Sequence, residues 1–410
     1  MTNIEFIVGG VVRDDDYFFH KKYVNEVWEL LKSNNIILLS PRRTGKTSLM
    51  RRLDTEPAPN YKIIHLNVED LKSPDSFYLN LLNTLNEDQP EYFKKLSKGW
   101  DFAKEKLSKI EELGAISFKV KLRQDTNWEK NWENISQDLM SKIAQLEDKV
   151  LFIIDEFPDM LDAILKQDRA KAITFLHHFR KMRLDFKMNN IRWLIGGSVN
   201  IKGVLNEENL INTINDFHIE TLPNIDDQEV ESFISTMLTN RKVIFNQDIF
   251  GVMRDLLGEP MPYFLQLFTQ ELYRYWRKNQ NKLEEIGVKE VKEVFNHTLL
   301  GDAAQDKLQH FHSRIKLYYP SELQEITFLL LNSLSQSNIG ISKKQLYTQY
   351  ANHQQDKRGY TQDSTTKLQD AFKGLLLRLE SDFYIYENNG VCSFKTHLIK
   401  IWWCKNWAEL

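Results

Sequence analysis

The stretch that decides the fold is SPRRTGKTSLM, which runs from Ser40 to Met50. It follows the short apolar run Ile36–Leu39, which predicts a strand, and it opens a helix predicted over Lys46–Leu53. Except that Ser40 replaces the first glycine, the stretch matches the phosphate-loop pattern G-x-x-x-x-G-K-[ST]. In such a loop, successive backbone N–H groups at a helix N-terminus form a cradle for phosphate. The stretch therefore predicts a nucleotide-binding site.

The chemistry of phosphate binding assigns roles to the side chains of this loop. Gly45 lets the backbone approach the phosphates without a Cβ, and Lys46 reaches the β- and γ-phosphate oxygens, which also makes it a candidate catalytic residue. Thr47 offers its hydroxyl to Mg²⁺. Arg42 and Arg43 would add charge near the phosphates or would simply be solvated. The residues expected to bind the nucleotide here are Ser40, Pro41, Arg42, Arg43, Thr44, Gly45, Lys46, Thr47 and Ser48.

Two acidic residues, Asp155 and Glu156, end the most apolar run of the chain, Val150–Ile154. Ligands of open α/β folds bind at the carboxyl ends of parallel strands. We therefore expect Asp155 to hold Mg²⁺ together with Thr47, and Glu156 to polarise the attacking water as the general base. The alternative is a helix-capping acid followed by a surface glutamate. A phosphate loop on another strand of the same predicted sheet favours the functional interpretation.

A double glycine ends the strand predicted at Trp193–Ile195, and polar residues follow it. The sequence there is Gly196-Gly197-Ser198-Val199-Asn200. We expect Ser198, or else Asn200, to contact the γ-phosphate or the attacking water, so Ser198 is a candidate catalytic residue. A glycine turn with a serine that caps a helix is the alternative.

The order of strand and helix patterns predicts an α/β fold with a parallel sheet flanked by helices. Continuous apolar strands separated by helical periodicity are typical of a sheet buried on both faces. We expect residues 1–220 to form a nucleotide-binding core with a helical insertion at about 87–149. Within that insertion, Ile116–Leu122 alternates and would be an edge strand or a hairpin.

The rest of the chain predicts two further domains. Residues 221–300 show only helical patterns and predict a small helical domain. Residues 301–410 contain helical patterns followed by two short alternating strands, joined by Asn388-Asn389-Gly390. Because Asn-Gly favours a tight hairpin turn, this last region predicts a winged helix.

Composition narrows the class of protein. The 410 residues suggest two or three domains at roughly 150 residues each. With 54 basic and 57 acidic residues, a general basic coat for nucleic acid is excluded, although a local patch is not. Two cysteines, Cys392 and Cys404, fit a reducing compartment. The N-terminus lacks the pattern of a signal peptide and no apolar run is long enough to span a membrane, so we expect a cytoplasmic protein.

These motifs together resemble the AAA+/STAND branch of P-loop ATPases, and the archaeal-type ATPase group with a C-terminal winged helix in particular. The resemblance covers nearly the whole chain. Besides the phosphate loop, it rests on Phe18–Lys21, Leu151–Phe157, Ile195–Ser198, Gly258–Pro260 and Phe394–Trp403.

The resemblance implies an ATPase that uses ATP and Mg²⁺, with a helical lid at 221–300. Gly258 and Pro260 would form the lid's G-x-P turn, which closes on the nucleotide. Val11, Val12 and Phe18 would contact the adenine. The winged helix would act as a sensor or docking arm. Because Ser40 departs from the family pattern and no arginine finger is evident, hydrolysis is expected to be weak without a partner.

The leading functional interpretation is an ATP-driven molecular switch that controls a partner protein, in bacterial defence or a related regulatory system. A DNA-binding ATPase of the initiator or transposition type is the first alternative. Charge disfavours it, since residues 301–410 carry 13 basic and 11 acidic residues and Glu380, Asp382 and Glu387 flank the hairpin.

A nucleotide-dependent assembly scaffold with little hydrolysis is the second alternative, and it would involve oligomerisation. The aromatic tail formed by Trp402, Trp403 and Trp407 could then be a partner surface, although we expect it to pack in the core. His177 and His178 lack spaced carboxylate partners, so they are not expected to bind zinc.

Overall fold

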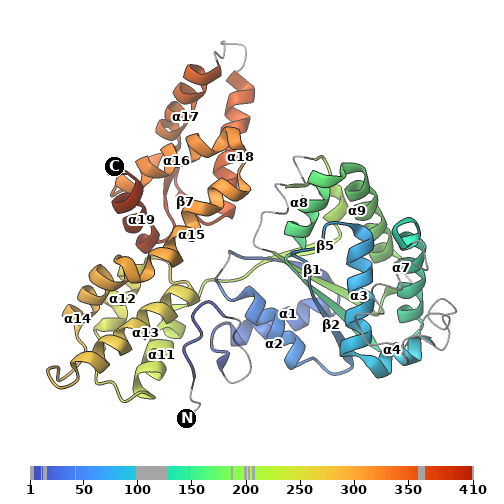
Figure 1. The fold of residues 1–410 in the computed structure, drawn as a ribbon, viewed down its shortest axis with the longest axis horizontal. Helices are drawn as coiled ribbons and strands as arrows, with labels where there is room; N and C mark the ends of the chain where they lie inside the picture. The colour runs from blue at the N-terminus through green and yellow to red at the C-terminus, as the bar shows by residue number, and fades with distance from the viewer. Residues whose placement is uncertain are drawn as a thin grey trace. The chain divides into compact units, whose positions relative to one another are not determined.

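A computed structural model gives the structure of the chain, and it divides into two compact units (Figure 1). Unit 1 comprises Met1–Phe19, Arg43–Gly45 and Pro223–Leu410, and unit 2 comprises His20–Arg42 and Lys46–Leu222. The residues that the structure describes are 4–10, 12, 16–41, 43–97, 128–146, 148–185, 188–197, 201, 204–205, 208–358 and 365–408.

Unit 2 is built on a five-stranded sheet in which every neighbouring pair of strands is parallel. The order of the strands is β2-β3-β4-β1-β5. Their continuous runs of apolar residues, many of them β-branched, favour strands. Strand β3 is buried along nearly its whole length. The strands are β1 (Asn35–Leu39), β2 (Tyr61–Asn67), β3 (Lys149–Asp155), β4 (Ile191–Gly197) and β5 (Phe217–Thr221).

Helices cover both faces of this sheet. Figure 1 shows α1 and α2 on one side and α3, α7 and α9 on the other, and side chains of the second group share one apolar core with the strands. Ser73 and Ser76 form a capping box that begins α3. The helices are α1 (Lys21–Leu31), α2 (Lys46–Thr55), α3 (Pro74–Asp88), α4 (Pro90–Ser97), α7 (Trp128–Ala144), α8 (Phe157–Gln167) and α9 (Arg169–Leu184), with a short 3₁₀ helix at Ile211–Ile214.

The predicted parallel sheet flanked by helices is confirmed, with one strand that the sequence did not suggest. Strand β5 pairs with β1 at the edge of the sheet, where Tyr23 donates a hydrogen bond of 3.2 Å to Glu220. The expected insertion contains α4 and α7. The strand or hairpin expected at Ile116–Leu122 lies outside the described residues.

The first helices of unit 1 pack around one apolar core, which also takes in side chains from the start of the chain. Arg241 donates a hydrogen bond of 2.9 Å to the carbonyl of Ile4, and the N–H of Ile7 donates one of 3.2 Å to Gln266. These helices are α11 (Asp227–Thr239), α12 (Ile249–Leu257), α13 (Pro262–Asn279) and α14 (Val288–Val294), which continues as a π-helical turn at Phe295–Leu299.

The last part of unit 1 has the order of elements that the winged-helix prediction requires. Its sheet has the order β6-β8-β7 and is antiparallel. Asn389 and Gly390 both have positive φ, as a tight type I′ hairpin needs, so the predicted hairpin is confirmed. The elements are α15 (Asp302–Tyr318), α16 (Ser321–Gln336), β6 (Ile341–Ser342), α17 (Lys343–Arg358), α18 (Thr365–Ser381), β7 (Ile385–Asn388), β8 (Val391–Phe394), α19 (His397–Trp403) and a π-helical turn at Cys404–Ala408.

The aromatic tail packs inside unit 1, as expected. Trp402 and Trp403 are fully buried, and their indole N–H groups donate to Gln305 and Asn332 at 2.7 and 2.8 Å. Trp407 is half-buried and stacks on the imidazole of His312, with ring centroids 3.7 Å apart. The alternative of a partner surface is therefore wrong for the first two tryptophans. Within the described part of the chain, no helix combines the length and apolar character needed to span a bilayer.

Candidate functional site

The phosphate loop lies where the sequence predicted it, between β1 and α2. Gly45 has φ of 99°, a backbone conformation that side chains with a Cβ resist, so glycine is required there. Lys46 and Thr47 are the first two residues of α2. Their side chains thus start at the helix N-terminus, where backbone N–H groups and the helix dipole favour an anion.

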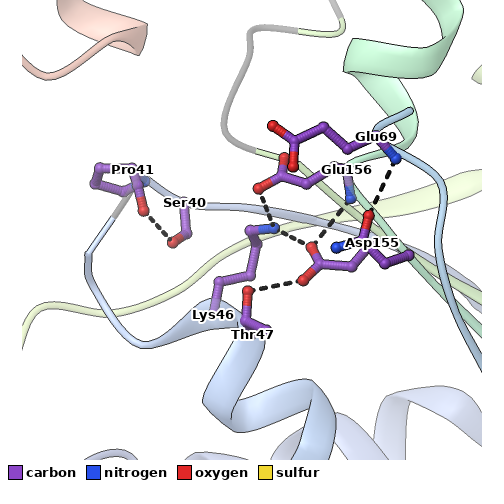
Figure 2. A network of polar contacts seen from close by, with 8 residues as sticks. Ser40, Pro41, Lys46, Thr47, Glu69, Asp155 and Glu156 are labelled. Carbon is purple, nitrogen blue, oxygen red and sulfur yellow. Dashed lines mark hydrogen bonds and ion pairs between the residues drawn. The ribbon is translucent and has the colours of Figure 1, made fainter. Parts of the chain in front are cut away.

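Lys46 and Thr47 both bind the carboxylate of Asp155, which ends β3 (Figure 2). The hydroxyl of Thr47 donates a hydrogen bond of 2.7 Å to one carboxylate oxygen, and the ammonium of Lys46 donates to the other. The side chains of Lys46 and Asp155 are only 4% and 2% exposed. A buried charge needs a partner of opposite sign, and these two residues provide it for each other.

The ionisation of Asp155 follows from these contacts. Burial alone would raise the pKa of its carboxyl group, but the ammonium of Lys46 and the hydrogen bonds from Lys46 and Thr47 outweigh that effect. The pKa of Asp155 therefore lies below its ordinary value. The side chain stays a carboxylate at neutral pH, which suits a metal ligand and not a proton carrier.

Glu156 follows directly and turns its carboxylate toward the same ammonium. One of its oxygens lies 3.7 Å from the Nζ of Lys46, and the side chain is 14% exposed. Its backbone is left-handed, with φ of 60° and ψ of 33°, at the N-cap of α8, and its side chain makes no capping hydrogen bond. The N–H of Glu156 donates instead to the Asp155 carboxylate at 3.1 Å. A capping acid followed by a surface glutamate therefore does not describe this pair.

The left-handed conformation of Glu156 carries a cost. A residue with a Cβ loses roughly 1–2 kcal/mol in this region, and such outliers gather at functional sites. The conformation places the side chain beside Lys46, as Figure 2 shows. This backbone feature supports a functional role for Glu156 independently of the sequence motif.

The strand between the phosphate loop and the acidic pair is β4, because the strand order is β3-β4-β1. A Cβ on Gly196 would lie 2.1 Å from the Cε of Met50 and 3.3 Å from the Cδ of Lys46, and a Cβ on Gly197 would lie 2.3 Å from the ring of Pro158. The double glycine therefore lets β4 pass closely between α2 and α8. Ser198 and Asn200, the expected phosphate or water contacts, lie outside the described residues.

The other residues expected in the phosphate loop are placed as follows. Ser40 is buried, and its hydroxyl donates a hydrogen bond of 3.0 Å to the carbonyl of Pro41. Arg43 has φ of 73° and belongs to unit 1, where its guanidinium lies 4.1 Å from the ring centroid of Tyr263. Thr44 and Ser48 are half-buried, and Arg42 lies outside the described residues.

The residues that the family resemblance placed around the adenine and in the lid belong to unit 1. Phe18 packs edge-on against Phe19 and Phe233, with ring centroids 5.3 Å away in each case. Val12 is half-buried, and Val11 lies outside the described residues. Contact of these three with a nucleotide remains a prediction.

The turn expected to close on the nucleotide packs against the start of α19. Gly258 has φ of 76° and forms an antiparallel bridge with Thr396, and a Cβ there would lie 2.6 Å from the backbone nitrogen of His397. Glu259 pairs with Lys395 at 3.4 Å, and Pro260 is half-buried. Packing within unit 1 thus accounts for the glycine, and a contact of Gly258 and Pro260 with the nucleotide stays a prediction.

Some residues near the sheet have structural roles. Arg183 forms an ion pair of 2.8 Å with Asp216, and its side chain is only 1% exposed, so the pair is buried. His178 is buried and lies 2.8 Å from the hydroxyl of Ser136. Among the described residues, no group of three or more histidines, cysteines, aspartates or glutamates is arranged to hold a metal ion.

The sequence analysis did not identify the residues that pack against β4 next to the site. Met50 and Pro158 close on the double glycine of β4, and neither was singled out. The signal that could have found them is the glycine pair itself, since a glycine inside a buried strand marks a close approach of another segment.

Together, the strand order, the loop before α2 and the acids after β3 define the P-loop nucleotide-binding fold. No family model matches the sequence, and no curated protein matches it. Solved structures do resemble it. A Walker-type ATPase of Pyrococcus abyssi superposes with a TM-score of 0.60 at 14% identity, over 97% of this chain and 99% of that one.

The ORC2 protein of Aeropyrum pernix, solved in complexes with ADPNP and ADP, superposes with a TM-score of 0.56 at 12% identity. That superposition covers 97% of this chain and 96% of the other. The expected fold of a P-loop ATPase is therefore confirmed along nearly the whole chain.

Proposed function

We propose that this protein binds ATP with Mg²⁺, hydrolyses it, and uses the nucleotide state to control a partner protein. One observation carries the first part of the proposal. Lys46, Thr47, Asp155 and Glu156 meet at the carboxyl edge of the sheet, with a cation, a hydroxyl and two carboxylates in contact. The fold shared with a Walker-type ATPase supports the same conclusion.

The residues present suit Mg²⁺ and a nucleotide phosphate. The hydroxyl of Thr47 and the carboxylate of Asp155 are hard oxygen donors 2.7 Å apart, the ligand type that Mg²⁺ prefers. The buried ammonium of Lys46 is the charged group that phosphate-binding loops use. Bound Mg²⁺ would supply charge neutralisation at the phosphates.

Each side chain has a separate task in hydrolysis. Lys46 exchanges part of its contact with the carboxylates for the β- and γ-phosphate oxygens and stabilises their charge. Asp155, ionised because of its lowered pKa, holds its position through Thr47 and Lys46. Glu156 accepts the proton of the attacking water. Contacts from Ser198, and from Val11, Val12, Phe18, Gly258 and Pro260, would complete the nucleotide site.

The first test separates binding from hydrolysis. Lys46→Ala should abolish tight ATP binding in calorimetry, because a charge-assisted contact contributes about 1.5–3 kcal/mol. Glu156→Gln should retain binding but slow phosphate release at least about tenfold, because a positioned base contributes about 10²–10⁴-fold. Lys166→Ala is the matched control, since Lys166 is an exposed lysine on α8 that pairs only with Asp162 among the described residues.

The outcomes of this test are decisive. Unchanged ATP affinity in Lys46→Ala would remove the nucleotide site. Wild-type turnover in Glu156→Gln would remove Glu156 as the base and leave binding intact. Loss of both properties in Lys166→Ala would show that the assay reports general damage and not the site.

The second part of the proposal is the switch, in which ATP changes the relation of unit 1 to unit 2. Fluorescent labels at Lys166→Cys in unit 2 and Arg274→Cys in unit 1 use two exposed positions. Cys404→Ser removes the partly exposed native thiol, and burial raises the pKa of Cys392 to about 11, which keeps that thiol unreactive. ATP should change the transfer efficiency in the wild type and not in Lys46→Ala.

Two other functions are outcomes of the same experiments. If ATP changes the molecular mass in solution but not the label distance, the assembly scaffold replaces the switch. If a labelled DNA duplex binds at moderate salt, the DNA-binding ATPase replaces the protein partner. Charge supports a protein partner, because residues 301–410, with 13 basic and 11 acidic residues, are nearly balanced in charge. A role in defence or regulation would follow from the partner's identity.

A further inference from the structure

We propose that the groove between α17 and α18 binds an amphipathic helix of a partner protein, whose apolar stripe is flanked by acidic residues. The groove lies wholly within unit 1 and has a volume of about 560 Å³. Its two helices are labelled α17 and α18 in Figure 1. The inference rests on the proposed function only for the existence of a partner protein, since the groove can be tested without ATP hydrolysis.

The floor of the groove is apolar. Tyr347 from α17 and Phe372 and Leu376 from α18 line it, and the rings of Tyr347 and Phe372 lie edge-on with centroids 5.4 Å apart. Leu377 also lines the groove and is 60% exposed. An exposed leucine beside an aromatic floor leaves apolar surface in water, and its burial by a partner would be favourable.

The rim carries a cation on each wall. Lys344 lies on α17 and Lys373 on α18, so each of the two helices contributes a cation to the lining. Lys373 has a loose pair of 3.5 Å with Asp370, in which both side chains are about 70% exposed, and such pairs contribute little. Lys344 forms no ion pair with the described residues. A helix with acids on both sides of its apolar stripe matches this arrangement.

The third lysine and the single acid of the lining do not change this pattern. Lys343 is held by Glu387 at 2.8 Å, on the hairpin side. Burial raises the pKa of Glu380, the acidic residue at the end of the groove. With an apolar floor and a carboxyl group at Glu380, the groove is unsuited to a DNA backbone, which needs several phosphate contacts.

The geometry also suits a helix better than an extended peptide. Two helices form the walls, and grooves of this kind take the apolar face of a third helix through anchors at i, i+3, i+4 and i+7. No unpaired sheet edge is needed for such binding.

The test uses a displayed library of helical peptides on the full-length chain. The library keeps apolar residues at i, i+3, i+4 and i+7 and varies the flanking positions among Glu, Lys and Gln. Selection should enrich glutamate on both flanks. A selected peptide, labelled with fluorescein, should bind the wild type, and Leu377→Ser should weaken it about tenfold or more because a buried leucine contributes about 1.5–3 kcal/mol.

Charge reversal sharpens the test. Lys344→Glu combined with Lys373→Glu should lose the glutamate-flanked peptide and gain a lysine-flanked peptide of the same apolar stripe. Ile244→Ser is the matched control, because Ile244 is 59% exposed but lies in the connection before α12, outside the groove. Lys46→Ala should bind the peptide like the wild type, so failure of ATP binding and failure of docking are told apart.

Several results would overturn the proposal. Enrichment without acidic flanks, or equal loss in Leu377→Ser and Ile244→Ser, would remove the groove as the docking site. Duplex DNA binding that falls with the two lysine reversals but not with Leu377→Ser would assign the surface to nucleic acid. Concentration-dependent self-association lost in Leu377→Ser would assign it to a second copy of the chain.

Discussion

At the scale of single residues, the left-handed backbone of Glu156 lowers stability but positions a side chain that we propose is needed for ATP hydrolysis. Glycine populates the left-handed region freely, so Glu156→Gly should relieve the local strain. We expect the free energy of unfolding to rise by up to about 1 kcal/mol while ATP hydrolysis is lost. Denaturant unfolding and phosphate release measured on the same preparation check both effects.

Glu156→Gln is the control for this prediction, because glutamine keeps the Cβ and hence the strain. It should lose hydrolysis without the gain in stability. A Glu156→Gly protein that unfolds more easily than the Glu156→Gln protein would show that the left-handed turn is not strained.

A second residue-scale prediction concerns pH and His178. Burial, aided by Lys181, lowers the pKa of His178 from its ordinary 6.5 to about 4. The unfolded chain therefore takes up this proton before the folded chain does, and the stabilisation from neutral His178 is complete above about pH 6.5 and is lost as the pH falls toward 4.

His178→Gln keeps a side chain that can bond Ser136 but cannot be protonated. Its denaturant midpoint should therefore fall less than that of the wild type between about pH 7 and about pH 5. The pKa of His312 in unit 1 is lowered by burial in the same way, so some pH dependence should remain in the variant. An identical pH dependence in both proteins would contradict the lowered pKa of His178.

At the scale of elements, the two glycines of β4 lie against neighbours of different rigidity. Gly196 faces the flexible side chain of Met50, and Gly197 faces the ring of Pro158. Gly197→Ala would drive its Cβ to 2.3 Å from the ring of Pro158, which cannot move without α8. Gly196→Ala would meet the end of Met50, a flexible side chain. We expect Gly197→Ala to lower the free energy of unfolding by about 1–3 kcal/mol and Gly196→Ala to lower it by less.

Gly251→Ala is the control for these substitutions. Gly251 lies within α12, and nothing stands within 4 Å of a Cβ added there. Alanine should stabilise that helix by roughly 0.5–1 kcal/mol relative to glycine. Equal losses in Gly196→Ala and Gly197→Ala, measured by denaturant unfolding, would show that the rigidity of the neighbour does not decide the effect.

A comparison of the strands also shows which parts of the fold can be predicted from the sequence. The runs that became β1 and β3 are continuous and apolar because both faces of those strands are buried, and this pattern is visible without any tertiary information. Strand β5 lies at the sheet edge and is only partly buried, with His218 and Glu220 in it, so its pattern resembles that of a loop. Its pairing with β1 supplies the strand character that the sequence lacks.

The candidate site shows the same division. Lys46, Thr47, Asp155 and Glu156 could be predicted because phosphate and metal chemistry requires those side chains after strands. The left-handed backbone of Glu156 could not, because it arises where β3 turns into α8 and no local preference of glutamate favours it. The contact of Gly258 with His397 joins residues far apart in the sequence, so only the fold reveals it.

At the scale of the whole molecule, the start of the chain belongs to unit 1, whose largest segment, Pro223–Leu410, follows unit 2. A fragment of residues 223–410 would lack this segment and leave the surface around Phe233 and Arg241 uncovered. A synthetic peptide of residues 4–19 should therefore raise the melting temperature of that fragment in proportion to its concentration, as a ligand of the folded state does.

The control peptide carries Phe6→Ser and Phe19→Ser. Phe6 lies 4.2 Å from the guanidinium of Arg241, and the ring centroid of Phe19 lies 4.8 Å from that of Phe233. This peptide should leave the melting temperature unchanged. The melting temperature is followed by calorimetry. If both peptides shifted it equally, the segment would contribute no specific packing.

The hydrogen bond from Arg241 to Ile4 joins residues 237 positions apart in the sequence. During synthesis, Ile4 is therefore made well before the residue that binds it. At about 5–20 residues per second, the ribosome reaches Arg241 roughly 10–50 seconds after Ile4. All of unit 2, whose residues lie between His20 and Leu222, is synthesised during that interval. The first residues, with Phe6, Phe18 and Phe19 among them, must wait without their binding surface. This segment of the nascent chain therefore stays without its packing partners throughout the synthesis of unit 2.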